Sequence, residues 1–357
     1  FPTRRSSDLW TFDARLSNIG TDGYIDRASV DLNSYYLQGG YFAKNTSVKL
    51  IAFAGKEKTY HAWGYATKEE MEKFGRRYNP CGEMYTDADG NKHYYTDQTD
   101  NYLQKNYQLL LNHSFSTAWN LNVALHYTKG DGYYEEYKPG SSLVEYGLKP
   151  FNPDGTETNE SDLVRQKKMD NKFGGGVFSL NYTGNRLTAS LGGGLNQYRG
   201  NNFGKVTWVK NYIGNLSPEH EYYRNKSKKT DGNIYLKANY DLTSTLSAYA
   251  DLQYRHIDYT IDGVNDKYDW NKNALRPLAV DKKFDFFNPK VGLNWNITPN
   301  HRLYASFSVA QKEPTRNNYT DGDPDSYPKA EKLLDYEAGY TFANPWLTAG
   351  ANFYYMD

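Results

Sequence analysis

The amino-acid sequence predicts an all-β fold, a transmembrane antiparallel β-barrel, and three observations support this prediction. Apolar and polar residues alternate with a period of two over stretches of about ten residues, the length at which a tilted strand crosses a bilayer. Short and long connections alternate along the chain. Aromatic residues make up 16% of the 357 residues, with 35 Tyr, while hydrophobic residues total only 38%. A sheet with one wet face and aromatic girdles on the other has this composition.

The strand pattern is clearest in residues 119–127, where Trp119, Leu121, Val123, Leu125 and Tyr127 share one face. The same alternation recurs in 233–242, 246–255, 290–297 and 302–309. We expect the apolar faces to point outward into lipid, because the pattern leaves no other apolar surface to bury. The opposite faces suit a wet lumen; they carry Asn120, Asn122, Lys237, Asn239, Asp241, Gln253, Arg255, Lys290 and Asn294.

The connections alternate between two lengths. Short turns lie at 44–46, 116–118, 183–185, 243–245, 298–300 and 343–345. Long polar connections lie at about 18–33, 61–100, 129–171, 199–229, 260–285 and 311–333, with at best one helical turn at 68–73. Repeated loops above about 15 residues are uncommon in compact soluble domains, whereas outer-membrane barrels have tight periplasmic turns and long outer loops. Six of each imply about thirteen strands, so we expect a fragment of a larger, even-numbered barrel.

A soluble β-sandwich, jelly roll or propeller is the alternative fold. A sandwich would have shorter strands and more varied connections, and no repeat of 40–50 residues recurs as a propeller requires.

Several function classes lack support in the sequence. The 42 basic and 42 acidic residues balance, which argues against nucleic acid as the main partner. One Cys and seven scattered His give no disulfide and no metal-binding spacing. No G-x-S-x-G elbow occurs, and in Asp321–Asp325 a proline and a missing distal Glu break the match to a calcium loop. Mean hydropathy is −0.87, and no apolar run approaches the ~18 residues of a spanning helix. We therefore expect no enzyme activity, no metal and no cofactor.

Aromatic and histidine side chains in the long connections are the candidate ligand-binding residues. Such residues can grip a ligand or merely pack the loop, and both interpretations stay open. The candidates are His61, Trp63, His93, Tyr94, Tyr95, Tyr133, Tyr134, Trp208 and Tyr212.

Two glycine triplets, 174–176 and 192–194, lie equally far from Gly184. In an antiparallel hairpin centred on Gly184, Gly175 would face Gly193 directly. Because glycines have no side chains, two facing triplets would permit a bend in the barrel wall, or the close approach of another domain held inside the barrel. Neither triplet opens a helix in a βαβ unit, so nucleotide binding is not predicted.

Residues 1–9, Phe-Pro-Thr-Arg-Arg-Ser-Ser-Asp-Leu, are what one frame of a common short-read library adapter encodes. We interpret them as a sequencing artefact and exclude them from the fold; a natural basic tail is the alternative.

The stretch 303–357 carries the most specific motifs. Glu313-Pro-Thr-Arg316 is followed by Glu331-Lys-Leu-Leu-Asp-Tyr-Glu-Ala-Gly-Tyr340 and by Tyr354-Tyr-Met-Asp357. This pattern resembles the late barrel of TonB-dependent outer-membrane receptors, especially those of the Bacteroidetes type, and 20–27 and 36–41 resemble an earlier loop and strand of the same family. The residues that match the family motif are Glu313, Pro314, Arg316, Glu331, Tyr336, Glu337 and Gly339.

The resemblance implies a barrel of about 22 strands closed by a plug. Residues 10–357 would be a partial barrel domain without the plug, the TonB-contacting box and the last strands, and Gly175 and Gly193 would be possible plug-facing positions. The implied function is active uptake in the outer membrane by a monomer, with lipid, a small-molecule ligand and the TonB complex as partners. A ferric siderophore or similar iron complex is the expected cargo. Cobalamin, haem or an oligosaccharide on the same fold, or a passive porin, are the alternatives.

Overall fold

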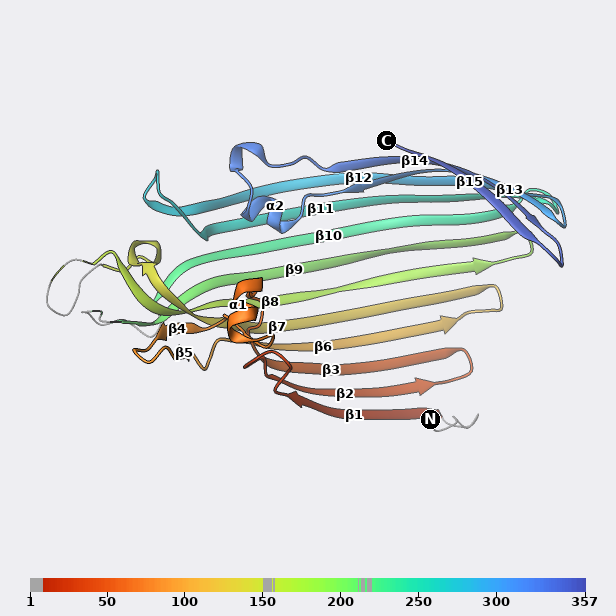
Figure 1. The fold of residues 1–357 in the computed structure, drawn as a ribbon. Helices are drawn as coiled ribbons and strands as arrows, with labels where there is room; N and C mark the ends of the chain where they lie inside the picture. Colours follow the sequence, from red (N-terminus) through yellow and green to blue (C-terminus); the bar gives the residue numbers. More distant parts are fainter. Residues whose placement is uncertain (1–8, 150–155, 157, 211, 213–215, 217–219) are drawn as a thin grey trace.

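A computed structural model describes residues 9–149, 156, 158–210, 212, 216 and 220–357. Within these ranges the chain forms one 13-stranded antiparallel sheet and a separate two-stranded hairpin (Figure 1). Each strand of the main sheet pairs with the next along the chain, except that β3 pairs with β6 across the β4–β5 hairpin. The main-sheet strands are β1 (Trp10–Thr21), β2 (Val30–Phe42), β3 (Thr46–Tyr60), β6 (Thr99–Ser114), β7 (Trp119–Ser142), β8 (Glu160–Thr183), β9 (Leu187–Val209), β10 (Glu221–Asp241), β11 (Leu246–Asp269), β12 (Ala274–Thr298), β13 (His301–Lys312), β14 (Glu331–Ala343) and β15 (Thr348–Met356). The hairpin is β4 (Glu83–Thr86) with β5 (Lys92–Tyr94).

Four short helical segments lie in the connections: α1 (Lys68–Phe74), η1 (Leu143–Tyr146), α2 (Arg316–Thr320) and η2 (Pro324–Ser326). Helix α1 is longer than the single predicted turn, and a capping box satisfies backbone N–H groups at its start. The Glu70 amide donates to Thr67 Oγ1 at 3.2 Å, and the Thr67 amide donates to Glu70 Oε2 at 2.8 Å. In the ranges described, no helix has the length and apolar character needed to cross a membrane.

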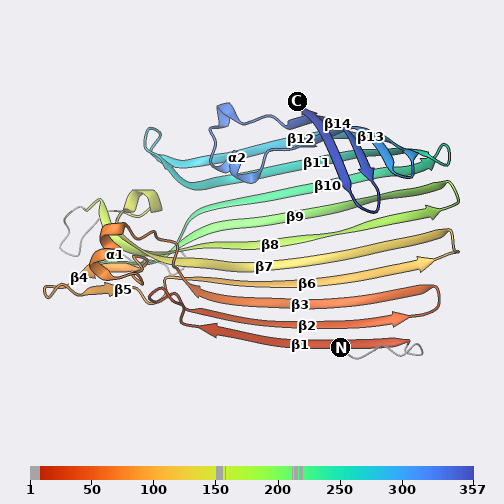
Figure 2. The same cartoon turned by 45° about the vertical axis from the view of Figure 1, so that its right-hand side comes forward.

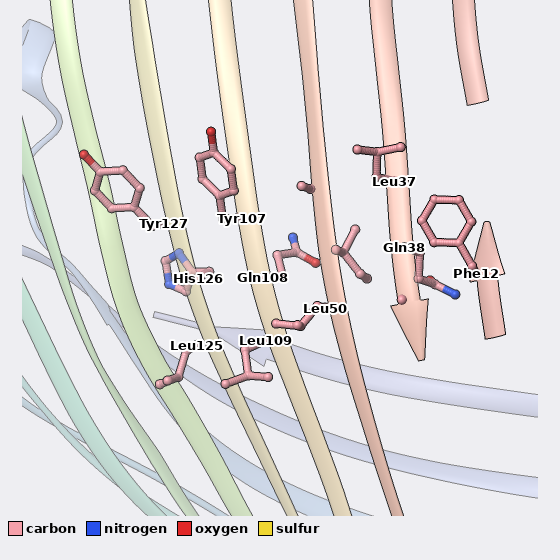
Figure 3. A pocket seen from close by; sticks show the side chains of 13 residues that line it. Phe12, Leu37, Gln38, Leu50, Tyr107, Gln108, Leu109, Leu125, His126 and Tyr127 are labelled. Atoms are coloured by element: carbon pink, nitrogen blue, oxygen red, sulfur yellow. The ribbon is translucent and has the colours of Figure 1, made fainter. Parts of the chain in front are cut away.

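The predicted apolar face is exposed on the sheet. Side chains at both ends of the 119–127 strand stand open, with Trp119 42% and Tyr127 43% exposed, and Leu252 of β11 is 41% exposed. No second sheet packs on them, since the other sheet in the described ranges is the β4–β5 hairpin. The prediction of about thirteen strands with outward apolar faces is confirmed. Figure 3 shows part of this outer face, a shallow groove along β2, β3, β6 and β7 where leucines lie beside Tyr107 and Tyr127.

The strands are longer than the sequence pattern predicts. Residues 129–142, 160–171 and 260–269 were expected in connections, but they continue β7, β8 and β11 as paired strand. The backbone ladder needs only partners for its N–H and C=O groups, whereas the period-two pattern needs one apolar face. Beyond the apolar zone the outer face becomes mostly polar, so the strands continue where their sequence pattern ends.

The predicted pairing of Gly175 with Gly193 is wrong. The hairpin closes through Gly184–Leu187, with the Gly184 amide donating to the Leu187 carbonyl at 2.8 Å, so its centre lies beyond Gly184. This shifts the register by three residues and pairs Gly175 with Asn196 and Gly193 with Phe178.

An odd shift moves the two glycines to opposite faces of the sheet. Gly193 lies on the outer face beside Phe178, so it cannot face a plug in the lumen. Gly175 lies on the inner face opposite His126. A Cβ at Gly175 would lie 2.3 Å from Asn196 Oδ1, which is 2.8 Å from His126 Nε2. The glycine therefore leaves room for this hydrogen bond, and contact with a plug there stays a prediction.

The buried core lies where connecting segments pack on the inner face. Residues 313–330 run back along the sheet, and α2 lies over β11 (Figures 1 and 2). Tyr319 is only 1% exposed and packs with Ile257 and Ile261 of β11. A second cluster joins Leu143 and Tyr146 of η1 to Leu163 and Val206 of the adjoining strands. Both clusters occupy the end of the sheet opposite the short turns.

Candidate functional site

An aromatic corner lies on the inner face, at the end opposite the short turns. The ring of His61, which follows β3, stacks on Trp63 at 3.7 Å between centroids. Tyr134 of β7 lies edge-on to both rings, 5.5 Å from Trp63 and 6.0 Å from His61. His61 is 2% exposed, whereas Trp63 is 50% exposed. The corner therefore presents an open indole held by a buried imidazole and a phenol.

Burial sets the charge of this corner. Loss of hydration lowers the pKa of His61 from its ordinary value of 6.5 to about 4. His61 Nε2 lies 3.8 Å from Asp100 Oδ2, beyond hydrogen-bond distance. The imidazole is therefore neutral near pH 7, and the corner acts as an apolar aromatic surface.

Two ion pairs lie beside the corner on the inner face of β7, β8 and β11. Arg165 pairs with Glu136, with Nε donating to Oε1 at 2.6 Å. Lys167 pairs with Asp266, and its Nζ also lies 5.8 Å from the centroid of the Tyr134 ring. The Lys167 side chain keeps 22% of its surface exposed. A cation is thus held next to the aromatic corner.

These four charged residues lie in stretches that the sequence pattern predicts to be loops, so the pattern does not identify them as wall residues. The alternation of side chains between the two faces of a strand was the available clue. Glu136 continues the inner face of β7 that begins at Asn120, and Arg165 pairs directly with Glu136. Counting alternate residues past the end of the apolar pattern would have placed Glu136 on the inner wall, but not Asp266, which lies in a stretch of β11 where the register shifts.

Glu313 of the family motif fastens the β13–β14 connection to the inner wall. Its carboxylate accepts hydrogen bonds from Lys229 of β10 and from Arg255 of β11, the latter at 3.1 Å from Nη1. Arg255 also donates to Asp231 at 2.6 Å. Three residues further along, Arg316 donates to Asn225 Oδ1 at 2.8 Å. These contacts, on either side of Pro314, position α2 over the inner face.

The remaining motif residues build strand β14. Glu331 begins it opposite Lys312, and Glu337 pairs with Ser306. The ring of Tyr336 lies 4.8 Å from Phe307. A Cβ at Gly339 would lie 2.2 Å from Tyr304 Cε1, so the glycine makes room for that ring. These positions shape the wall rather than a ligand site.

Three sequence-predicted candidates pack the β4–β5 region. His93 stacks on Tyr85 at 4.5 Å. Tyr94 lies 3.4 Å below the guanidinium of Arg27, and the hydroxyl of Tyr95 donates to Glu135 at 2.5 Å. None of these three joins the aromatic corner.

The remaining three candidate ligand-binding residues lie outside both the aromatic corner and the β4–β5 region. Tyr133 alternates with Tyr134 and so lies on the outer face, with Lys168 Nζ 4.6 Å from its ring. Trp208 stacks on Tyr137, and Tyr212 packs against the η1 cluster. The structure thus brings together three of the nine candidates. Among the residues it describes, no group of His, Cys, Asp and Glu is arranged to hold a metal ion.

Comparison with protein families matches residues 58–357 to the TonB dependent receptor-like β-barrel model. The chain belongs to the TonB-dependent receptor family. It is therefore an outer-membrane β-barrel protein, as predicted, and its long connections lie on the extracellular side. The Bacteroidetes subtype stays a prediction.

Solved structures agree with this fold. The ferric-catecholate import receptor Fiu from E. coli K12, in its open form, matches with a TM-score of 0.64 and 12% identity, over 99% of this chain and 56% of that one. The ferric yersiniabactin uptake receptor FyuA from Yersinia pestis matches with a TM-score of 0.61 and 11% identity, over 98% and 50%. The siderophore receptor PiuA from Acinetobacter baumannii matches with a TM-score of 0.62 and 10% identity, over 98% and 53%.

The chain thus spans about half the length of these receptors. At such identities the likeness concerns the fold. A search of curated protein sequences finds no match.

Proposed function

We propose that this TonB-dependent receptor barrel takes up a ferric siderophore or a similar anionic iron complex. The carrying observation is the half-exposed Trp63, set against Tyr134 and next to Lys167 on the inner wall. Iron complexes of catechol ligands present flat rings and negative charge, and those of carboxylate ligands present negative charge. The Trp63 and Tyr134 rings can stack on flat ligands. The Lys167 ammonium, which pairs with Asp266 but keeps 22% of its side-chain surface exposed, attracts negative charge.

The comparisons support this cargo class indirectly. The three matched receptors are named for ferric catecholate, ferric yersiniabactin and siderophore uptake. We further propose that a plug domain closes the complete barrel and that the inner-membrane TonB complex supplies the energy through it. In this proposal residues 10–357 are the barrel part of a monomeric receptor, and residues 1–9 are adapter-derived.

The test uses the complete receptor gene in a host that lacks its own siderophore receptors. Uptake and binding of 55Fe-labelled catecholate and citrate complexes are measured for Trp63→Ala. Loss of one stacked ring is expected to weaken binding about tenfold. Trp208→Ala is the matched control, because Trp208 is 43% exposed but does not belong to the corner. Equal effects of the two variants, or no effect of Trp63→Ala, would overturn the proposed site.

The alternative cargoes are outcomes of the same assay. Competition by a neutral oligosaccharide, cobalamin or haem, with no competition by ferric complexes, would replace the iron proposal. Uptake that persists in a host without TonB would indicate passive diffusion and overturn active transport.

A further inference from the structure

The outer face of the barrel carries a row of cations at one register level. Five neighbouring strands, β6 to β10, each place one basic side chain directly opposite the next. All five side chains are exposed. The members of this cationic row are Lys105, Lys129, Lys172, Arg199 and Lys228.

The row lies on the lipid-facing side of the wall. Lys105 and Lys129 are two residues beyond Tyr107 and Tyr127, so they share the face that Figure 3 shows. Trp119, at the opposite end of the apolar face of β7, is ten residues before Lys129. At about 3.3 Å per residue and a tilt of about 40°, that separation is about 25 Å along the barrel axis. The apolar band of outer-membrane barrels has this height, so the row lies at the extracellular head-group level.

Pairing within the protein does not neutralise the row. Like charges directly opposite each other on a sheet repel. Among the residues described, no ion pair within 4 Å involves a member of the row, and Arg199 donates to the neutral Gln197 at 2.7 Å. The nearest acids on this face lie one level away from the row. Asp131 and Asp170 lie one level further out and pair with each other in the register, and Asp262 lies at that level opposite Lys226, whereas Asp258 lies one level further in. An anion from outside the protein would relieve the repulsion.

We propose that the cationic row binds the phosphate groups of lipid head groups in the outer leaflet of the outer membrane. With strands about 4.8 Å apart, five strands span about 20 Å, enough to face a bis-phosphorylated glycolipid. Lysines attract phosphate as point charges, and the Arg199 guanidinium can contact it through two N–H groups. Below Lys105 and Lys129 of the row, the apolar face continues through Tyr107 and Tyr127 to Leu109 and Leu125, which fits acyl chains. This continuity favours a lipid over free phosphate.

The test measures lipid binding to the purified complete receptor in detergent. The probes are bis-phosphorylated lipid A, its dephosphorylated form and inorganic phosphate, counted by native mass spectrometry. The variant is Lys129→Gln/Lys172→Gln/Arg199→Gln. The control, Lys68→Gln/Lys73→Gln/Lys272→Gln, removes three cations from helix α1 and the β11–β12 turn. Each cation near an anionic lipid contributes about fivefold, so the row variant is expected to bind lipid A about 100-fold more weakly and the control equally well.

The wild-type receptor alone also tests the proposal if the row variant fails to assemble. It should bind the phosphorylated lipid, lose it as salt rises, and bind the dephosphorylated lipid weakly. Equal binding of both lipids, or unchanged binding by the row variant, would overturn the proposal. Tight binding of inorganic phosphate alone would show a phosphate site instead and would also overturn it. Siderophore binding should not change in any of these variants.

Discussion

Replacing Glu313 by Gln should loosen the β13–β14 connection from the inner wall. The change keeps the shape of the side chain and one acceptor oxygen, but it removes the charge that faces Lys229 and Arg255. Removing one partner of a fully buried pair costs about 3–5 kcal/mol, and an exposed pair contributes about 0–1 kcal/mol. Glu313 is 9% exposed, whereas Lys229 and Arg255 are 29% and 24% exposed, and Arg255 keeps Asp231. We expect a cost of about 2 kcal/mol.

Hydrogen exchange of the α2 amides measures this cost. A loss of about 2 kcal/mol in opening free energy corresponds to about 30-fold faster exchange. Asp321→Asn is the matched control in the same connection, because Asp321 and its partner Lys267 are 57% and 45% exposed, and it should change exchange by less than about twofold. Lys229→Met combined with Glu313→Gln should add little to either single change. Exchange in Glu313→Gln within threefold of wild type would refute this account of the clamp.

Three further predictions concern stability and assembly. Gly263→Ala should destabilise the barrel by about 2 kcal/mol or more in urea unfolding, because φ is 123° there and a Cβ would lie 2.3 Å from the Arg224 carbonyl oxygen, whereas Gly39→Ala has open space and should be nearly neutral. Since the pKa of His61 is about 4 when folded and 6.5 as a free group, packing of the 61–98 segment should be full above pH 6.5. It should weaken by up to about 3 kcal/mol as the pH falls to 4, and Cys81 should then react faster with a pyridyl disulfide. Residues 10–357 made alone should not yield a heat-modifiable monomer in detergent, because β1 and β15 each have one unpaired edge.

Each of these predictions has a clear contrary result. Equal urea midpoints for the two alanine variants would mean that the wall adapts freely at Gly263. A Cys81 reaction that does not depend on pH, or that keeps its dependence in His61→Gln, would remove His61 as the titrating group. A monodisperse folded monomer of residues 10–357 would show that the open edges are tolerated.

The sequence could predict the parts of the fold that depend on local alternation. Trp119 to Tyr127 showed one apolar face, and the short turns gave the strand count, because both patterns lie within about ten residues. The register of the β8–β9 hairpin was missed because Gly184 opens a four-residue turn instead of forming its centre. Turn geometry depends on backbone angles that composition does not specify.

The candidate site could be predicted only in part for a different reason. His61, Trp63 and Tyr134 were named individually, but their contact joins residues about 70 positions apart through the pairing of β3, β6 and β7. Tyr133 and Tyr134 are adjacent residues of the same type, so composition does not distinguish them. They differ in the face of β7 on which each side chain lies. The ion pairs of Lys167 and Glu313 also depend on contacts between distant strands, which one sequence does not reveal.

The strand order of the main sheet has a consequence for how the barrel can form and diversify. Neighbours in the sheet are also neighbours along the chain, except β3 and β6, which the β4–β5 segment separates. Contact order is therefore low for a β-sheet of this size, and each new hairpin can pair with the open edge left by the previous one. An insertion as long as residues 61–98 adds loop-closure entropy that grows only slowly with length. The extracellular connections can thus gain or lose whole segments while the order of assembly along the wall is unchanged.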